Sequence, residues 1–146
     1  MRMALVETTQ QYIDRILGNV AGANPLEVLA ATAPRLRELI AGRGREELSR
    51  QATPDQWSVV EILAHLADSE IVGAWRFRSV LAADAVPLQA YDQNAWAAAF
   101  RYRDTDPHAS LDLFDVTRRS TLALVGRVDP PRLITTACTP SAAANR

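Results

Sequence analysis

His65 is the residue of this chain whose neighbours could support chemistry. Glu61 lies four residues before it, and Asp68 and Ser69 lie three and four residues after it. On a helix these offsets place all four side chains on one strip of surface. An imidazole with a carboxylate near its second ring nitrogen is a common arrangement for a metal ligand. The alternative is a structural histidine that only hydrogen-bonds to a carboxylate, because a metal site generally needs three or more protein ligands.

The remaining candidates are weaker. His108 follows a proline in a polar turn and is expected to face solvent or to lie in the first turn of a helix. Cys138 has no histidine near it in the sequence and is not expected to be a nucleophile. Asp92, between Tyr91 and Trp96, could orient a neighbouring side chain, although a helix cap is the preferred interpretation. The sequence contains no HxxxH, HExxH or CxxC motif and no glycine-rich phosphate loop.

Length and composition restrict the class of protein. The chain has 146 residues, enough for one domain with a real core, and a net charge of −1. Near-neutral charge without a basic stripe argues against nucleic acid or an anionic membrane as a partner. No apolar run reaches the length of a membrane span, and the N-terminus lacks the apolar core of a signal peptide. With a single cysteine there is no disulfide framework, so we expect a cytoplasmic protein.

Apolar residues follow helical spacing along nearly the whole chain. The clearest helix is predicted over residues 58–83, where Ser58 and Glu61 form a capping-box pattern. Other helices are predicted over residues 10–20, from Pro25 to the glycine at 42, and from about residue 111 to 128. Pro34 is expected to kink or split the second of these. Long helices without strand signals predict an all-α, antiparallel helical bundle.

The end of the chain differs from the rest. Residues 134–146 have no helical stripe and no cap, and their composition is typical of a disordered tail. We therefore expect a single domain over residues 1–133, followed by this aberrant tail.

The stretch Trp57–Glu70, WSVVEILAHLADSE, resembles the signature of the DinB-like superfamily. Further similarity comes from residues 91–96, YDQNAW, and from the helix that carries Arg118 and Leu122. Two arginines and a proline add to it, namely Arg76, Arg78 and Pro87. The resemblance extends from about Leu26 to Leu133.

This resemblance implies a four-helix bundle, often a homodimer, that holds a divalent metal such as zinc or nickel through three histidines. His65 matches one of these ligands, and the other two form an HxxxH pair on the final helix. Some relatives transfer low-molecular-weight thiols, such as bacillithiol or mycothiol. The metal would lower the pKa of a bound thiol or water. The resemblance thus implies a metal-dependent thiol transferase or hydrolase that acts on a small molecule.

The chain departs from the family pattern because it lacks the HxxxH pair and the helix that carries it. We expect a bundle truncated before its last helix, with an incomplete metal site. A frameshift near residues 131–138 is one explanation, since a shifted frame from Cys138 permits His-Pro-Glu-Arg-Gly, which is similar to a stretch in family members. Two functions stay open: a DinB-like metal-dependent enzyme, and a non-catalytic dimerisation or binding module in which His65 is structural.

Overall fold

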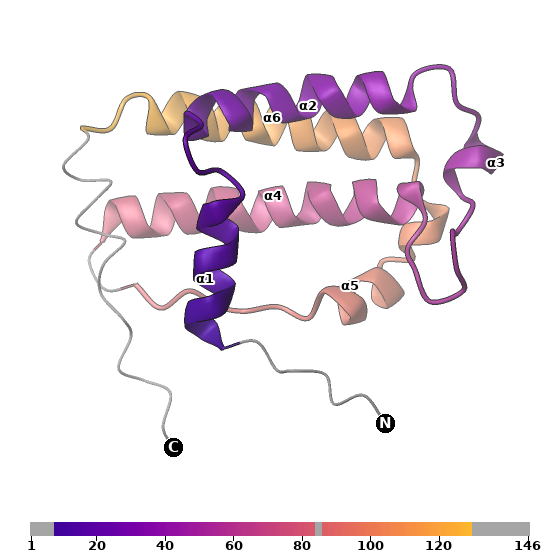
Figure 1. The fold of residues 1–146 in the computed structure, drawn as a ribbon, viewed down its shortest axis with the longest axis horizontal. Helices are drawn as coiled ribbons and strands as arrows, with labels where there is room; N and C mark the ends of the chain where they lie inside the picture. The colour runs from indigo at the N-terminus through magenta and orange to yellow at the C-terminus, as the bar shows by residue number, and fades with distance from the viewer. Residues whose placement is uncertain (1–7, 84–85, 130–146) are drawn as a thin grey trace.

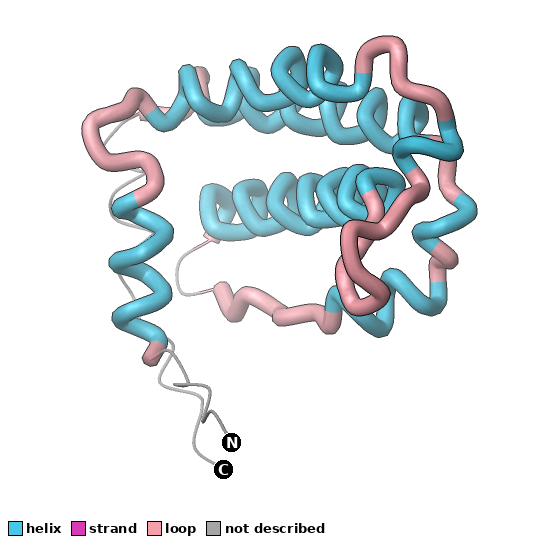
Figure 2. Tube along the Cα trace, turned by 45° about the vertical axis from the view of Figure 1, so that its right-hand side comes forward, coloured by secondary structure: helices cyan, strands magenta, loops and turns pink. Residues whose placement is uncertain are grey.

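The computed structural model describes residues 8–83 and 86–129, and within these ranges all regular structure is helical. The elements are α1 (Thr9–Gly18), α2 (Pro25–Ile40), α3 (Arg45–Leu48), α4 (Val59–Ala82), α5 (Gln93–Ala99), the 3-10 helix η1 (Tyr102–Asp104) and α6 (Pro107–Val125). Figure 2 shows these helices joined by loops. The all-α prediction is confirmed. The predicted tail, residues 134–146, lies outside the described residues.

Three long helices, α2, α4 and α6, run side by side (Figure 1). The main packing is between α4 and α6, and α2 also packs on α6. The buried apolar core comes from these three helices and from α3: Ala33, Ile40, Leu48, Val60, Leu63, Ala67, Leu111 and Phe114. α6 is therefore the element that holds α2 and α4 together. None of the helices within the described residues combines the length and the apolar composition of a membrane span.

The start of α4 is fixed by the predicted capping box. The Glu61 backbone N–H donates to Ser58 Oγ at 3.3 Å, and the Ser58 backbone N–H donates to Glu61 Oε2 at 2.8 Å. These bonds satisfy two backbone donors that a helix N-terminus leaves unpaired. The helix then continues to Ala82, so the predicted range of residues 58–83 is confirmed.

Pro34 does not split α2, which was one of the two outcomes expected from the sequence, and the alternative of a kink stays a prediction. One continuous α-helix runs from Pro25 to Ile40 with Pro34 inside it. A proline in this position removes a single backbone hydrogen bond. Ala33 and Ile40 on either side of it are buried in the core. Their packing keeps the helix continuous past the missing bond. The chain leaves α2 at Gly42, whose φ of 72° favours glycine.

A buried ion pair joins the three long helices. Arg118 of α6 donates to both carboxylate oxygens of Glu70 on α4, at 2.7 and 2.6 Å. Its Nη1 also donates to the Leu29 carbonyl of α2 at 3.2 Å. The guanidinium carbon lies 4.6 Å from the centre of the Phe114 ring. Because both charged side chains are almost fully buried, the pair fixes how the helices fit together.

Candidate functional site

His65 lies two turns into α4 and is half-buried. The Ser69 hydroxyl oxygen is 3.3 Å from His65 Nε2 and 3.5 Å from Nδ1. The Trp57 ring meets the imidazole edge-on, with ring centres 5.1 Å apart. The predicted strip on α4 therefore does bring Ser69 to His65. The His65 ring is therefore positioned by the Ser69 hydroxyl group and by the Trp57 ring.

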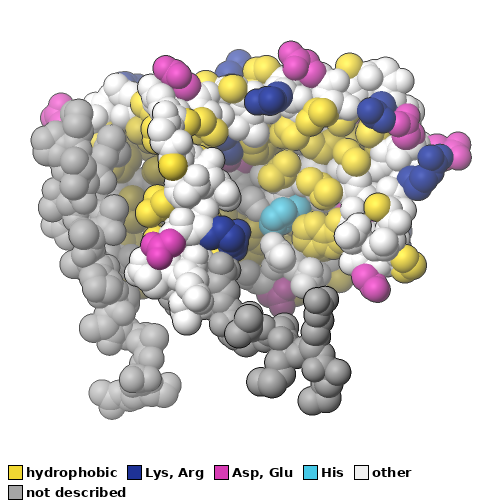
Figure 3. All heavy atoms as spheres, viewed as in Figure 1, with side chains coloured by type: hydrophobic (Ala, Val, Ile, Leu, Met, Phe, Trp, Pro, Cys, Tyr) yellow, Lys and Arg dark blue, Asp and Glu magenta, His cyan; other side chains and the backbone are white. Residues whose placement is uncertain are grey.

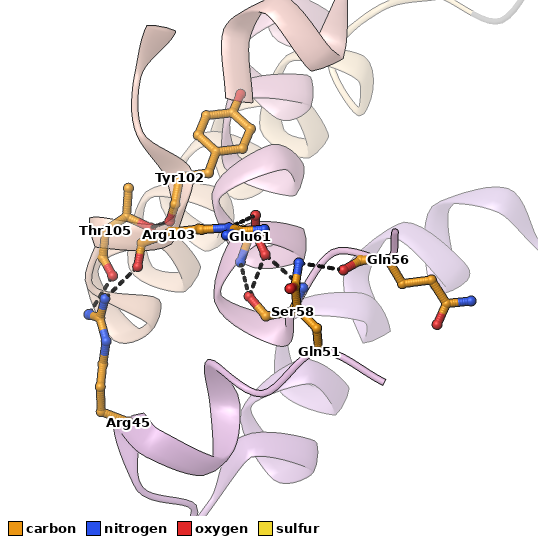
Figure 4. A network of polar contacts seen from close by, with 8 residues as sticks. All are labelled: Arg45, Gln51, Gln56, Ser58, Glu61, Tyr102, Arg103 and Thr105. Carbon is orange, nitrogen blue, oxygen red and sulfur yellow. Dashed lines mark hydrogen bonds and ion pairs between the residues drawn. The ribbon is translucent and has the colours of Figure 1, made fainter. Parts of the chain in front are cut away.

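The Glu61 carboxylate is hydrogen-bonded at the start of α4 and not to His65. Beyond the capping box, its Oε1 accepts a hydrogen bond of 2.9 Å from Arg103 Nε on η1. Burial raises the pKa of the Glu61 carboxyl, but the hydrogen bonds from Ser58 and Arg103 outweigh burial, and the pKa is lowered overall. Figure 4 shows this carboxylate in a network that reaches Arg45 of α3. Arg45 in turn donates to the carbonyls of Thr105 and Arg103.

Asp68 is also engaged away from His65. Its Oδ2 accepts a hydrogen bond of 2.5 Å from the hydroxyl of Tyr102, a buried residue of η1. Burial, together with the neighbouring Asp68 carboxylate, raises the pKa of the Tyr102 hydroxyl, which therefore stays protonated. The expectation of a carboxylate hydrogen-bonded to His65 is wrong, because Glu61 and Asp68 each have a donor on η1.

Ser69 also contacts the first of a row of three aromatic side chains, Tyr91, Trp96 and Phe100. The hydroxyl groups of Ser69 and Tyr91 are 2.7 Å apart. The Tyr91 ring centre is 4.5 Å from that of Trp96, which is 5.4 Å from that of Phe100. From the sequence, Tyr91 and Trp96 were singled out only as aromatic neighbours of Asp92. Nothing in the sequence predicted the contact between Tyr91 and Ser69, which are 22 residues apart in the chain.

Asp92 is a helix cap. Its Oδ1 accepts hydrogen bonds from the backbone N–H groups of Asn94 and Ala95 at 2.9 and 3.1 Å. The preferred interpretation of Asp92 is therefore confirmed, and this residue starts α5. His108 is exposed in the first turn of α6, as the sequence predicted. Cys138 lies outside the described residues.

The environment of His65 favours its neutral form. Burial lowers the pKa of the imidazole, and the nearby charge of Asp68 opposes this effect only partly. A neutral imidazole offers a nitrogen lone pair, which is the form that binds a metal ion.

The residues around His65 do not form a complete metal site. Among the described residues there is no group of three or more His, Cys, Asp and Glu side chains placed to hold an ion. The chain has only two histidines, and His108 begins a different helix. The expected set of three histidines is therefore not available in one copy of this chain, and His65 is a single candidate ligand.

Comparison with known sequences decides the family. Residues 29–145 match the DinB superfamily. The chain belongs to the DinB superfamily. This confirms the resemblance found from the stretch around His65.

Two DinB-like relatives come from bacilli. A protein of Bacillus licheniformis named "Putative metal-dependent hydrolase" is 30% identical over 110 residues, which are 75% of this chain and 57% of the relative. The Bacillus subtilis protein named "Putative metal-dependent hydrolase YfiT" is 26% identical over 88 residues, which are 60% of this chain and 49% of YfiT. The chain thus spans about half the length of these two relatives.

The solved structure of YfiT from Bacillus subtilis has the same fold. It matches with a TM-score of 0.68 and 20% sequence identity, over 90% of this chain and 70% of YfiT. That structure is described as "a probable metal-dependent hydrolase with an unusual four-helix bundle topology". The predicted four-helix-bundle class is therefore confirmed, and α2, α4 and α6 are the long helices of the part described here.

Proposed function

We propose that this DinB-family chain is a metal-dependent hydrolase in which His65 supplies one ligand to a divalent ion. The relatives described above carry this activity in their names. Because the described residues offer no complete set of ligands, the remaining donors come from outside them or from a second protein chain.

The position of His65 carries this proposal. The imidazole is half-buried between Trp57 and Ser69, and a hydroxyl is the partner of its ring nitrogens. The two carboxylates on the same strip of α4 are bonded to η1. A metal-binding histidine usually donates its second ring N–H to an oxygen atom, and Ser69 Oγ can accept this hydrogen bond from His65. The other ring nitrogen then keeps its lone pair for a metal ion.

Zinc or nickel is the ion that we propose, because imidazole nitrogen suits both. Transfer of a low-molecular-weight thiol is a finer version of the same proposal, and it rests on the family resemblance alone. The two versions differ in the product. A hydrolase forms its product with water alone, whereas a thiol transferase needs an added thiol and incorporates it.

A second candidate is a non-catalytic helical module that binds or dimerises. The observation in its favour is the missing ligand set in the described part of the chain. In that case His65 would only fill the space between Trp57 and Ser69.

Equilibrium dialysis against zinc and against nickel separates the two candidates. The proposed hydrolase should retain metal, and His65→Ala should abolish this retention while His108→Ala leaves it unchanged. His108 is a matched control because it is the other histidine and is exposed on a different helix. Equal metal retention in the wild type and in His65→Ala would contradict the proposal. A wild type that retains no metal would favour the non-catalytic module.

A further inference from the structure

Arg76 on α4 carries a positive charge that forms no ion pair within the part of the chain that the structure describes. Its Nη2 atom donates a hydrogen bond of 2.5 Å to the Gln89 carbonyl. Arg76 Nε is buried and has no hydrogen-bond partner among the described residues. Buried polar atoms in folded proteins nearly always have a partner. The unpaired guanidinium nitrogen is therefore a candidate point for binding an acceptor from outside the chain.

Arg76 shares a strip of α4 with His65 and Ser69. It follows Ser69 by seven positions, which places the two side chains two helical turns apart on the same face. The chain that leads into α5 lies along this strip (Figure 1), since Gln89 contacts Arg76 and Tyr91 contacts Ser69. Helical side chains lean towards the N-terminus, so the guanidinium group is expected on the Ser69 side of its own Cα. The Cα atoms of His65 and Arg76 are roughly 16 Å apart along the axis, a span that suits an elongated ligand.

The strip between Ser69 and Arg76 is apolar and open. Val72 and Gly73 lie there, at helical spacing from both residues. A Cβ atom placed on Gly73 would meet nothing within 4 Å outside its own helix backbone. Glycine inside a helix is less favourable than alanine, so no packing contact accounts for its use here. Figure 3 shows a histidine among apolar side chains over α4 on one face of the molecule. A ligand that crosses this strip should therefore have an apolar body.

We propose that this strip binds a small molecule with one carboxylate group and an apolar body. The carboxylate pairs with Arg76, and the body crosses Gly73 towards Ser69 and His65. The proposal rests on the proposed function, since it names the class of substrate whose other end reaches the metal ligand His65. Because Arg76 Nε is buried, the ligand displaces part of the chain at residues 86–92, which has no regular secondary structure.

The chemistry of the strip favours a carboxylate over other acid groups. A guanidinium group offers two parallel N–H donors, which match the two oxygens of a carboxylate. Arg76 supplies one positive charge, and the neighbouring Ser69 and Tyr91 hydroxyl groups are neutral. One arginine balances a single negative charge, whereas a phosphate group carries a charge close to −2 near neutral pH.

NMR titration of the metal-free chain with hexanoate tests the proposal. Hexanoate should shift the ¹H–¹⁵N signal of Arg76 Nε–H, which Arg76→Gln assigns by removing it. Arg76→Gln should also raise the dissociation constant of hexanoate about tenfold or more, measured on the backbone amide of Gly73, because the positive charge is lost. Arg78→Gln is the matched control and should leave the dissociation constant unchanged. Arg78 lies on the same helix, but its Nη2 donates to Ser120 Oγ on α6.

Filling the open space at Gly73 tests the path of the ligand. Gly73→Leu should raise the dissociation constant of hexanoate about fourfold or more, which corresponds to the loss of one buried methylene contact. The Nε–H signal of Arg76 measures this change. The melting temperature should not fall, because the space is open and leucine favours a helix more than glycine does. Inorganic phosphate should bind more weakly than hexanoate.

Hexanoate that leaves the Arg76 and Gly73 signals unchanged would overturn the proposal. Equal effects of Arg76→Gln and Arg78→Gln, or tighter binding of phosphate than of hexanoate, would overturn it as well. Unchanged hexanoate binding in Gly73→Leu would overturn the path across this residue. Binding of hexanoate through Arg76 by a chain that retains no zinc would support the carboxylate site and contradict the proposed hydrolase. The two failures are therefore distinguishable.

Discussion

Replacing Arg118 by methionine should strongly destabilise the bundle. The Glu70 and Arg118 side chains expose only 11% and 13% of their surface, so the substitution would leave a carboxylate buried without its cation. Breaking a buried pair on one side costs about 3–5 kcal/mol. The bond to the Leu29 carbonyl and the contact with the Phe114 ring would be lost as well.

The expected loss of about 3–5 kcal/mol corresponds to a fall in melting temperature of roughly 10–15 °C for a chain of this size. Thermal unfolding followed by circular dichroism measures this change. The double variant Glu70→Met with Arg118→Met should recover more than half of the loss, because no unpaired charge then stays buried.

Arg37→Met is the control for this experiment. Arg37 also joins α2 to α6 through two carboxylates, at 2.7 Å from Asp112 and 3.2 Å from Asp115, but its side chain is 44% exposed. Exposed ion pairs add little to stability, so the melting temperature of Arg37→Met should stay close to that of the wild type. The reasoning fails if Arg118→Met and Arg37→Met lower the melting temperature by similar amounts, or if the double variant is less stable than Arg118→Met.

Three further predictions concern the neighbourhood of the candidate site. Burial lowers the pKa of His65 in the folded chain, so the unfolded chain binds the proton more readily. Stability should therefore fall as the pH drops below the ordinary value of 6.5, and His65→Gln should flatten this part of a urea-unfolding series. Tyr102→Phe removes the donor to Asp68 and should cost about 2 kcal/mol in urea unfolding, a change that refutes the assigned bond if it is absent. Arg101 has a positive φ of 52°, so Arg101→Gly should stabilise the chain by about 1 kcal/mol while Arg101→Ala should not. Equal effects of the two changes on the urea midpoint would contradict this explanation.

Features that depend on neighbours in the sequence were predictable. The capping box of Ser58 and Glu61 and the cap at Asp92 each join residues within three positions of one another. The approach of Ser69 to His65 follows from a spacing of four on a helix. These predictions hold because local backbone geometry alone determines the contacts.

Contacts across the bundle could not be predicted in the same way. Asp68 meets Tyr102 across 34 positions, and Glu61 meets Arg103 across 42. Both carboxylates bond to η1 and not to His65 because η1 packs against α4, and helical periodicity contains no information on that packing. At Pro34 the local preference for breaking a helix does not split α2, in which Ala33 and Ile40 are buried in the core.

The most direct test of the central claim is long-range ¹H–¹⁵N NMR of the histidine side chains during titration with zinc. The chain has two histidines, so the imidazole signals can be assigned by substituting His108 alone. If His65 is a metal ligand, one of its ring nitrogens should shift strongly as zinc is added, while the nitrogens of His108 stay unchanged. Signals of His65 that do not move at saturating zinc, or that move only as much as those of His108, would contradict the account.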